Sequence, residues 1–250
     1  MPPPHPLQIL LIVAACLLIG LSKGGLGGPI PVTLTTPLLS AVMPVSQAVS
    51  LVLPLLILAD VFALWAYWRA WDMRYVRLML PAAVLGTVLG LLLLAALPDL
   101  WLRRLLGLFT LTVVLYKTGS GRIARLHYQP RGWHGWLAGG VSGFASALAN
   151  TGGPPFTAYM LLQGVSPTVF IGTTTLFFAI TNLLRLPAVA AAGLLNFPLL
   201  FSAVWAIPLI PLGVWAGRRF INCVSPQLFE GLMLALLLAA SLSLILSSGA

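Results

Sequence analysis

Acidic residues are scarce in this chain: only 4 of its 250 residues are Asp or Glu, and charged residues of both signs make up 7%. Hydrophobic residues make up 60%. A soluble domain of this length needs far more polar surface than this composition supplies. The shortage of charge therefore excludes a soluble globular protein and indicates an integral membrane protein.

Cysteine is equally scarce. The two cysteines, Cys16 and Cys223, lie in or beside apolar segments, and the sequence contains no CxxC motif and no Cys/His cluster. Metal sites and disulfide frameworks are recognised by such clusters. We therefore expect neither a metal site nor a disulfide, and we expect no cofactor.

Catalytic and nucleotide-binding signals are also missing. The sequence has no Walker motif, so we do not expect ATP to drive the protein directly. The few carboxylates are scattered along the chain rather than paired, which argues against a membrane-embedded enzyme: Asp60, Asp72, Asp99 and Glu230.

Long apolar runs, by contrast, are plentiful, and they predict an all-α polytopic membrane protein. A helix needs about 20 mostly apolar residues to cross ~30 Å of hydrocarbon. Runs of this length cover residues 45–68, 75–97, 169–191, 197–217 and 227–247. Further helices are expected over residues 7–22, 29–42, 99–116, 133–149 and 156–163. We expect the first of these to be a retained helix, because no Lys or Arg precedes it as in a cleaved signal.

Glycine-rich breaks interrupt the apolar sequence at two places. The first break covers residues 22–29 (SKGGLGGP), and the second covers residues 149–155 (ANTGGPP). Gly27 and Gly152 are 125 residues apart, which is half of the 250-residue chain. Because short apolar segments flank each break, we expect two broken or re-entrant hairpins with the breaks at their tips.

Other landmarks recur at nearly the same spacing. Six pairs lie 122 to 128 residues apart and in the same order: Pro44 and Pro167, Asp60 and Asn182, Pro81 and Pro208, Gly86 and Gly213, Gly90 and Gly217, and Pro98 and Pro226. Together with the repeated breaks they indicate an internal repeat. We predict a first transmembrane repeat over residues 1–116, a basic cytoplasmic linker over 117–132 and a second transmembrane repeat over 133–250.

The basic residues predict the orientation. The net charge of +9 would suggest a nucleic-acid partner in a soluble protein, but here Lys and Arg lie mostly in short connections, where they orient the chain, and we expect no nucleic acid. A cytoplasmic linker would place 9 of the 13 basic residues inside: Arg69, Arg74, Arg77, Lys117, Arg122, Arg125, Arg131, Arg218 and Arg219. Only Arg103 and Arg104 fall outside. Each half then crosses the membrane an odd number of times, which predicts inverted repeats, about eight to ten membrane segments and periplasmic N- and C-termini.

The two breaks form the candidate binding site. Non-helical backbone is tolerated at membrane depth only where protein or a water-filled cavity satisfies it. Each break precedes a helix start, whose free N–H groups carry partial positive charge and suit an anion. The expected substrate-binding residues are Lys23, Gly24, Gly25, Gly27, Gly28, Asn150, Thr151, Gly152, Gly153, Thr173 and Asn182. The alternative is that the glycines serve helix packing, the hydroxyls cap broken helices and Lys23 reaches a lipid headgroup.

Asp60 and Arg185 are the remaining ionisable residues inside apolar runs. An intramembrane carboxylate can relay a proton, which would couple anion movement to the proton gradient. Asp60 can equally pair with Arg185 or cap a neighbouring helix end. The sequence leaves these roles open.

Several motifs follow one another in a recognisable order. They are residues 20–28 (GLSKGGLGG), 80–81 (LP), 86–90 (GTVLG), 143–144 (GF), 151–155 (TGGPP), 172–173 (GT), 182–187 (NLLRLP) and 211–217 (PLGVWAG). In this order and spacing they resemble the TauE/SafE family of membrane anion permeases, also called the sulfite exporter family. The resemblance covers nearly the whole chain. It implies a multi-pass transporter of the bacterial inner membrane for sulfite, sulfonates or related sulfur-containing or organic anions.

We therefore expect a secondary transporter, a permease without enzymatic activity, that moves a small anion across the bilayer. A proton or a sodium ion is the expected coupling ion. An anion channel on the same scaffold is the alternative. The sequence leaves the oligomeric state open.

Overall fold

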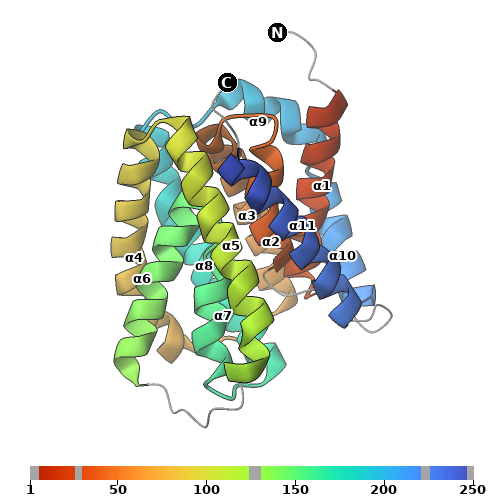
Figure 1. Cartoon of the computed structure of the whole chain (residues 1–250). Coiled ribbons are helices and arrows are strands. Elements are labelled where there is room, and N and C mark those ends of the chain that lie inside the picture. Colours follow the sequence, from red (N-terminus) through yellow and green to blue (C-terminus); the bar gives the residue numbers. More distant parts are fainter. Residues whose placement is uncertain (1–5, 26–29, 124–130, 221–225, 247–250) are drawn as a thin grey trace.

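A computed structural model describes residues 6–25, 30–123, 131–220 and 226–246, and these residues form helices and turns without a β-strand (Figure 1). The expected all-α membrane fold is confirmed. The helices are α1 (Pro6–Lys23), α2 (Ile30–Leu39), α3 (Val45–Ala66), α4 (Met73–Ala96), α5 (Asp99–Ile123), α6 (Gly132–Ala149), α7 (Gly153–Leu161), α8 (Pro167–Ala191), α9 (Phe197–Ala203), α10 (Leu209–Phe220) and α11 (Pro226–Leu246), with one 3-10 turn, Val204–Ala206, after α9.

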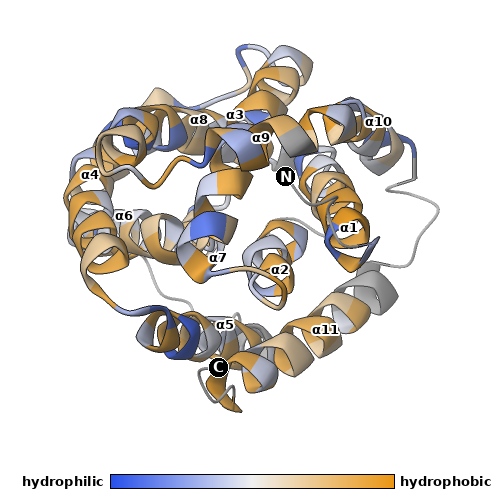
Figure 2. Cartoon of the chain, turned by 90° about the horizontal axis from the view of Figure 1, so that it is seen from above, coloured by the Kyte–Doolittle hydropathy of each residue, from blue (hydrophilic) through white to orange (hydrophobic). Residues whose placement is uncertain are grey.

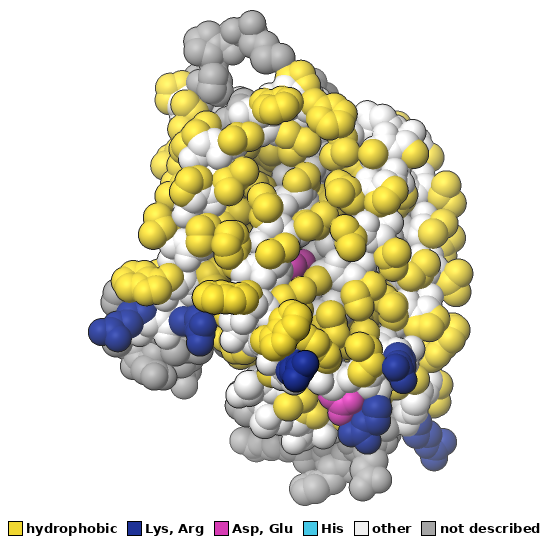
Figure 3. All heavy atoms as spheres, turned by 180° about the vertical axis from the view of Figure 1, so that it is seen from behind, with side chains coloured by type: hydrophobic (Ala, Val, Ile, Leu, Met, Phe, Trp, Pro, Cys, Tyr) yellow, Lys and Arg dark blue, Asp and Glu magenta, His cyan; other side chains and the backbone are white. Residues whose placement is uncertain are grey.

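The surface between the two ends of the molecule is apolar. Figure 3 shows hydrophobic side chains covering this wall, while Lys and Arg side chains gather at the lower end. On α4, for example, Leu85 and Leu89 are exposed, whereas Met79 and Ala83 on its other face are buried. An exposed apolar face beside a buried inner face is the pattern expected of a helix that borders lipid.

Four of the described helices are long and apolar enough to cross a membrane alone, namely α1, α3, α4 and residues Thr168–Ala191 of α8. A fifth span is possible if residues 197–206 and 209–219 count together, with a bend of 48° between them. The sequence predicted one continuous helix over 197–217, which is wrong. Pro208 lies at the bend and lacks the backbone N–H that a continuous helix would need there.

Helix α5 is longer than expected, because it continues to Ile123 instead of ending near Tyr116. Hydropathy marks where a chain leaves the lipid, but a polar segment can remain helical in water. In the extension the Thr118 hydroxyl donates to the carbonyl of Val114, one turn earlier. Residues 124–130 of the expected linker lie outside the described part of the chain.

The short helices α2 and α7 lie at the centre of the molecule, and the other helices surround them in the view from above (Figure 2). Burial agrees with this position, because α2 is buried at eight of its ten residues. Helices of 10 and 9 residues are too short to cross ~30 Å of hydrocarbon. They are therefore inner segments of broken hairpins rather than spans.

The two hairpins enter from opposite ends of the molecule (Figure 1). The pair α1 and α2 starts at the upper end and returns to it, since the backbone N–H of Val45 at the start of α3 donates to Asp99 at the start of α5. The pair α6 and α7 starts at the lower end and returns there, since Thr173 near the start of α8 contacts Asp72 at the start of α4. The described residues of the two breaks, 22–25 and 149–155, therefore lie inside the protein.

Two glycine-lined contacts hold the long helices together. Gly86 of α4 faces the backbone of Gly140 in α6, and a Cβ on Gly86 would lie 2.0 Å from the Gly140 carbonyl oxygen. Gly20 of α1 faces Gly213 of α10, where a Cβ would lie 2.5 to 2.7 Å from α10 backbone atoms. Such close backbone approach is typical of small-residue packing between membrane helices. Each contact joins a helix of the first half to a helix of the second.

Arg103, one of two exceptions to the expected charge asymmetry, has a structural role. Its Nε donates to Asp99 at 2.6 Å, and its two Nη groups donate to the carbonyl oxygens of Ser40 and Met43, just beyond the end of α2. A cation at a helix C-terminus satisfies carbonyl groups that lack partners within the helix. The position of Arg103 therefore follows from helix capping rather than from orientation.

Candidate functional site

A cavity of about 330 Å³ lies between the two breaks. The first hairpin contributes Lys23, Gly25 and Thr33 to its wall, and the second contributes Asn150 and Gly153. Its other lining residues are Ser22, Val32, Leu56, Ser146, Phe170, Ile171, Thr174, Thr175, Phe178 and Asn182. Both halves of the chain thus build one site.

Each break uses a residue in the left-handed backbone region. Gly25 has φ +100°, which an L side chain rarely adopts, and its N–H donates to the carbonyl of Ser22. Asn150 has φ +55° and ends α6, a position that Asn tolerates better than most residues. The chain reverses at both points, and the backbone beside the reversal faces the cavity.

Lys23 and Asp60 form a buried ion pair at the cavity wall. The Lys23 ammonium donates to Oδ1 of Asp60, and Nδ2 of Asn182 donates to Oδ2 at 2.9 Å. The Lys23 ammonium also lies 5.9 Å from the centre of the Phe178 ring, within cation–π range. Lys23 and Asn182 line the cavity, whereas Asp60 lies behind them.

Arg185 is fully buried, but it does not pair with Asp60. Its guanidinium donates to the carbonyl of Ser146 and to Oδ1 of Asn150. Nδ2 of Asn150 in turn donates to Thr36 in α2 and to the carbonyl of Val49 in α3. Arg185 therefore caps the end of α6 and, through Asn150, ties the second break to helices of the first half.

Some of the predicted binding residues lie away from the cavity. Gly24 packs against Gly217 of α10, where a Cβ would lie 2.9 Å from the glycine's Cα. A Cβ on Gly152 would clash with Ser142 and Ser146, and the Thr151 hydroxyl donates to the Ala145 carbonyl. Gly27 and Gly28 lie outside the described residues. Lys23, Gly25, Asn150, Gly153 and Asn182 are the predicted residues that line the cavity.

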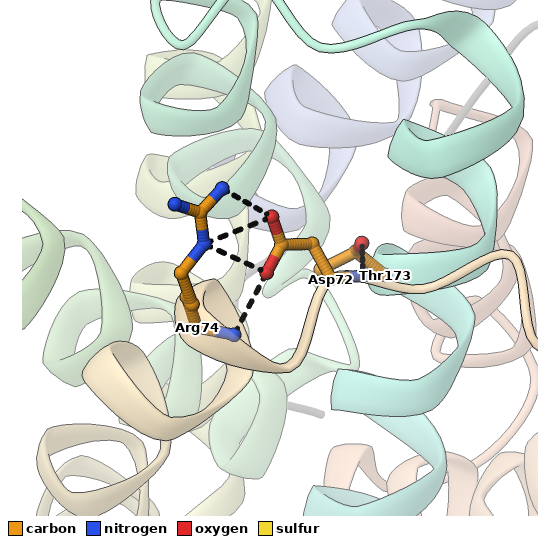
Figure 4. Close-up of polar contacts among 3 residues, drawn as sticks. All are labelled: Asp72, Arg74 and Thr173. Carbon is orange, nitrogen blue, oxygen red and sulfur yellow. Dashed lines mark hydrogen bonds and ion pairs between the residues drawn. The ribbon is translucent and has the colours of Figure 1, made fainter.

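Thr173 faces away from the cavity and anchors the turn between α3 and α4. The backbone N–H of Asp72 donates to the Thr173 hydroxyl at 2.9 Å (Figure 4). The Asp72 carboxylate caps α4 by accepting from the N–H of Arg74 at 2.9 Å, and it also accepts from the Arg74 guanidinium. These hydrogen bonds hold the pKa of Asp72 below its usual value.

The sequence reasoning missed one wall of the cavity, which α8 provides. Phe170, Thr174, Phe178 and Asn182 recur every four residues and line the cavity on one face of the helix. Side chains four apart share a helix face. Counting back by fours from Asn182, which was expected in the site, would have found this wall.

The fold and the cavity define a polytopic α-helical membrane protein with an internal cavity, lined by apolar and polar side chains, between two broken hairpins. Comparison with family models gives a match to the family described as sulfite exporter TauE/SafE over residues 12–244. The chain belongs to this family, and it is a multi-pass membrane protein of a transporter family. The comparisons with curated proteins and with solved structures gave no match.

Proposed function

We propose that the protein is a secondary transporter for a small anion, and not an enzyme, with sulfite, sulfonates and other sulfur-containing or organic anions as its substrate class. The observation that carries this proposal is the cavity lined by both breaks and by Lys23. Transporters with inverted repeats bind their substrates at such broken helices, whose N-termini point at anionic groups. The family match supports the substrate class.

The charge of the site supports an anion. Lys23 and Asp60 neutralise each other. Arg185 does not line the cavity, but it contacts the lining residues Ser146 and Asn150, and no carboxylate in the described part of the chain offsets its positive charge. The first turn of α2 and the start of α7 add the partial positive charge of two helix N-termini. In a medium of low dielectric constant this excess favours a negatively charged solute.

The shape and the apolar part of the wall suit a small organic anion. A volume of about 330 Å³ lies at the lower end of the range for small-molecule sites. Val32, Leu56, Phe170 and Phe178 can pack against a hydrocarbon portion, while the ammonium of Lys23 can meet an oxyanion. A wall with an apolar part and a charged part favours an organosulfonate over an inorganic ion.

Alternating access follows from the packing. The glycine contacts join α1 to α10 and α4 to α6, so these pairs are the natural rigid units. The cavity lies between them, because Lys23 at the end of α1 and Ser146 in α6 both line it. We propose that one pair rocks against the other, so that each moving unit combines both inverted repeats. The lower, basic end is the cytoplasmic side in this proposal, and the bacterial inner membrane is the location.

Flux measurements in proteoliposomes test this proposal. We expect saturable uptake of sulfite, thiosulfate or methanesulfonate, and acceleration of uptake by the same anion inside. Flux that does not saturate and shows no such exchange would indicate a channel and would contradict the transporter.

The role of Lys23 is tested in the same assay. Lys23→Gln should raise the apparent KM at least about tenfold, because a hydrogen bond to a charged group contributes ~1.5–3 kcal/mol. Lys23→Arg keeps the charge and is the matched control, with a smaller change expected. An unchanged KM in Lys23→Gln would remove Lys23 from the site.

A further inference from the structure

We propose that Lys23 and Asp60 form a proton-coupled exchange site, in which an anion replaces the Asp60 carboxylate at the Lys23 ammonium while Asp60 takes up one proton. Anion and proton then cross the membrane together. This inference rests on the proposed function of the cavity, and it assigns the coupling ion and the residue that carries it.

In this geometry an incoming anion and the Asp60 carboxylate compete for the Lys23 ammonium. The Lys23 ammonium lines the cavity, but its charge is already matched by Asp60 behind it, and the two side chains are only 11% and 2% exposed. An incoming anion would place a second negative charge within a few ångströms of the carboxylate. At low dielectric constant two close anions repel strongly, and protonation of the carboxyl group relieves the repulsion.

Asn182 can form a hydrogen bond with Asp60 both when Asp60 is a carboxylate and when it is protonated. Its Nδ2 donates to Oδ2 of the carboxylate at 2.9 Å. A side-chain amide also carries an acceptor oxygen, so after a turn of the amide it can accept the O–H of the protonated acid. Because Asn182 also lines the cavity, it lies between the anion and the proton site.

The other charged groups around α3 are engaged elsewhere. On α8, Arg185 donates to Ser146 and Asn150. On α10, Arg218 lies over the ring of Tyr67. On α5, Asp99 and Arg103 pair with each other beside the opposite end of α3.

The two remaining neighbours of α3 bring no charge close to Asp60. In α2 there is no titratable side chain, and on α6 His134 lies at the first turn and contacts Arg131. Within the described residues, Lys23 is the one charged group bonded to Asp60.

The exchange conserves charge. In the empty site the charges of the Lys23 ammonium and the Asp60 carboxylate sum to zero. With a monovalent anion bound, the ammonium and the anion sum to zero and Asp60 is neutral, its proton having come from water on the side to which the cavity opens. Both states therefore avoid the cost of carrying an additional charge through the membrane interior.

The wild-type protein in proteoliposomes gives the first test. Methanesulfonate is a suitable probe, because it carries a single negative charge that is constant around neutral pH, and any pH effect then belongs to the protein. We expect one proton to enter with each anion, measured with an internal pH indicator. We also expect the apparent Kd to rise about tenfold per pH unit where Asp60 is unprotonated in the empty protein.

Charge-matched variants give the second test. Asp60→Asn should lose the pH dependence of the Kd and should no longer accumulate anion in response to a pH gradient. The double variant Lys23→Gln/Asp60→Asn leaves no unpaired charge and should lose binding. Asp99→Asn removes a carboxylate outside the cavity and should keep the pH dependence.

The outcomes separate this inference from the proposed function. Saturable flux of methanesulfonate without proton entry, or accumulation of methanesulfonate driven by a pH gradient in Asp60→Asn, would overturn the exchange and leave the transporter in place. No saturable flux of any tested anion would contradict both. Should Asp60→Asn fail to fold, the proton-to-anion ratio of the wild-type protein still tests the exchange: a ratio of one supports it, and a ratio of zero overturns it.

Discussion

Buried ionisable side chains in this protein differ in how they are satisfied. Lys23 and Asp60 neutralise each other beside the cavity, an arrangement that a competing anion can open. Arg185 instead donates to neutral oxygens of Ser146 and Asn150, which leaves its positive charge in place. This difference is the reason why we propose a binding role for the Lys23–Asp60 pair and a structural role for Arg185.

Asp72 provides a residue-scale test outside the membrane interior. Asp72→Ala should lower stability by about 1 kcal/mol, because it removes the N-cap of α4. For a chain of this size that corresponds to a fall in Tm of about 2–4 °C in detergent. Asp72→Asn keeps a capping acceptor and should change Tm less. Equal losses in both variants would show that the charge, rather than the cap, stabilises the turn.

The pH dependence of this stabilisation has a defined sign. The pKa of Asp72 is lowered in the folded protein by its hydrogen bonds with Arg74. A carboxyl with a lowered folded pKa stabilises the protein above its unfolded pKa, near 4, and the contribution is lost as pH falls through the folded value. The difference in Tm between wild type and Asp72→Asn should therefore shrink below about pH 4.

Helix pairs form the next scale, and glycine sets their separation. In the pair of α4 and α6, a Cβ on Gly143 would lie 2.0 Å from the carbonyl oxygen of Ala83, so no side chain fits without moving a helix. A Cβ on Gly140 of the same helix would meet Ala82 atoms only at 3.6 Å or more, an ordinary contact. Two glycines three residues apart on α6 thus differ sharply in what they tolerate.

These two glycines give a matched comparison. Gly143→Ala should destabilise the protein by about 1–3 kcal/mol, the usual cost of overpacking. Gly140→Ala should be neutral or stabilising by up to about 1 kcal/mol, because alanine favours the helix. Thermal unfolding of both variants in detergent measures the difference. Equal stability would contradict the tight contact between α4 and α6.

For the whole molecule, the pairing of helices decides what can move. Figure 2 shows α2 and α7 enclosed by the longer helices, so the ends of both breaks are shielded from lipid. The glycine-packed pairs cross the boundary between the two halves of the sequence. The tight contacts therefore join segments from both halves, which is why the proposed rigid units differ from a division of the chain at its linker.

Sequence reasoning reached the membrane fold, the helices and the family because apolar run length and motif order are local signals. It reached Lys23, Asn150 and Asn182 because polar residues inside apolar runs stand out. It could not assign the partner of Asp60, since Lys23 is 37 residues away and Arg185 looked equally available. It also placed Thr173 in the site, because sequence alone did not show which face of α8 meets the cavity.

Protection of a cavity residue by substrate would show whether the transported anion passes through this cavity. In a background with Cys16 and Cys223 replaced, Thr174→Cys places a thiol on the cavity wall, and Arg77→Cys places one at an exposed position as a control. We expect methanesulfonate to slow labelling of Thr174→Cys by a small thiol reagent, with the same concentration dependence as its transport, and to leave labelling of Arg77→Cys unaffected. Unchanged labelling of Thr174→Cys at concentrations that saturate transport would contradict passage through this cavity.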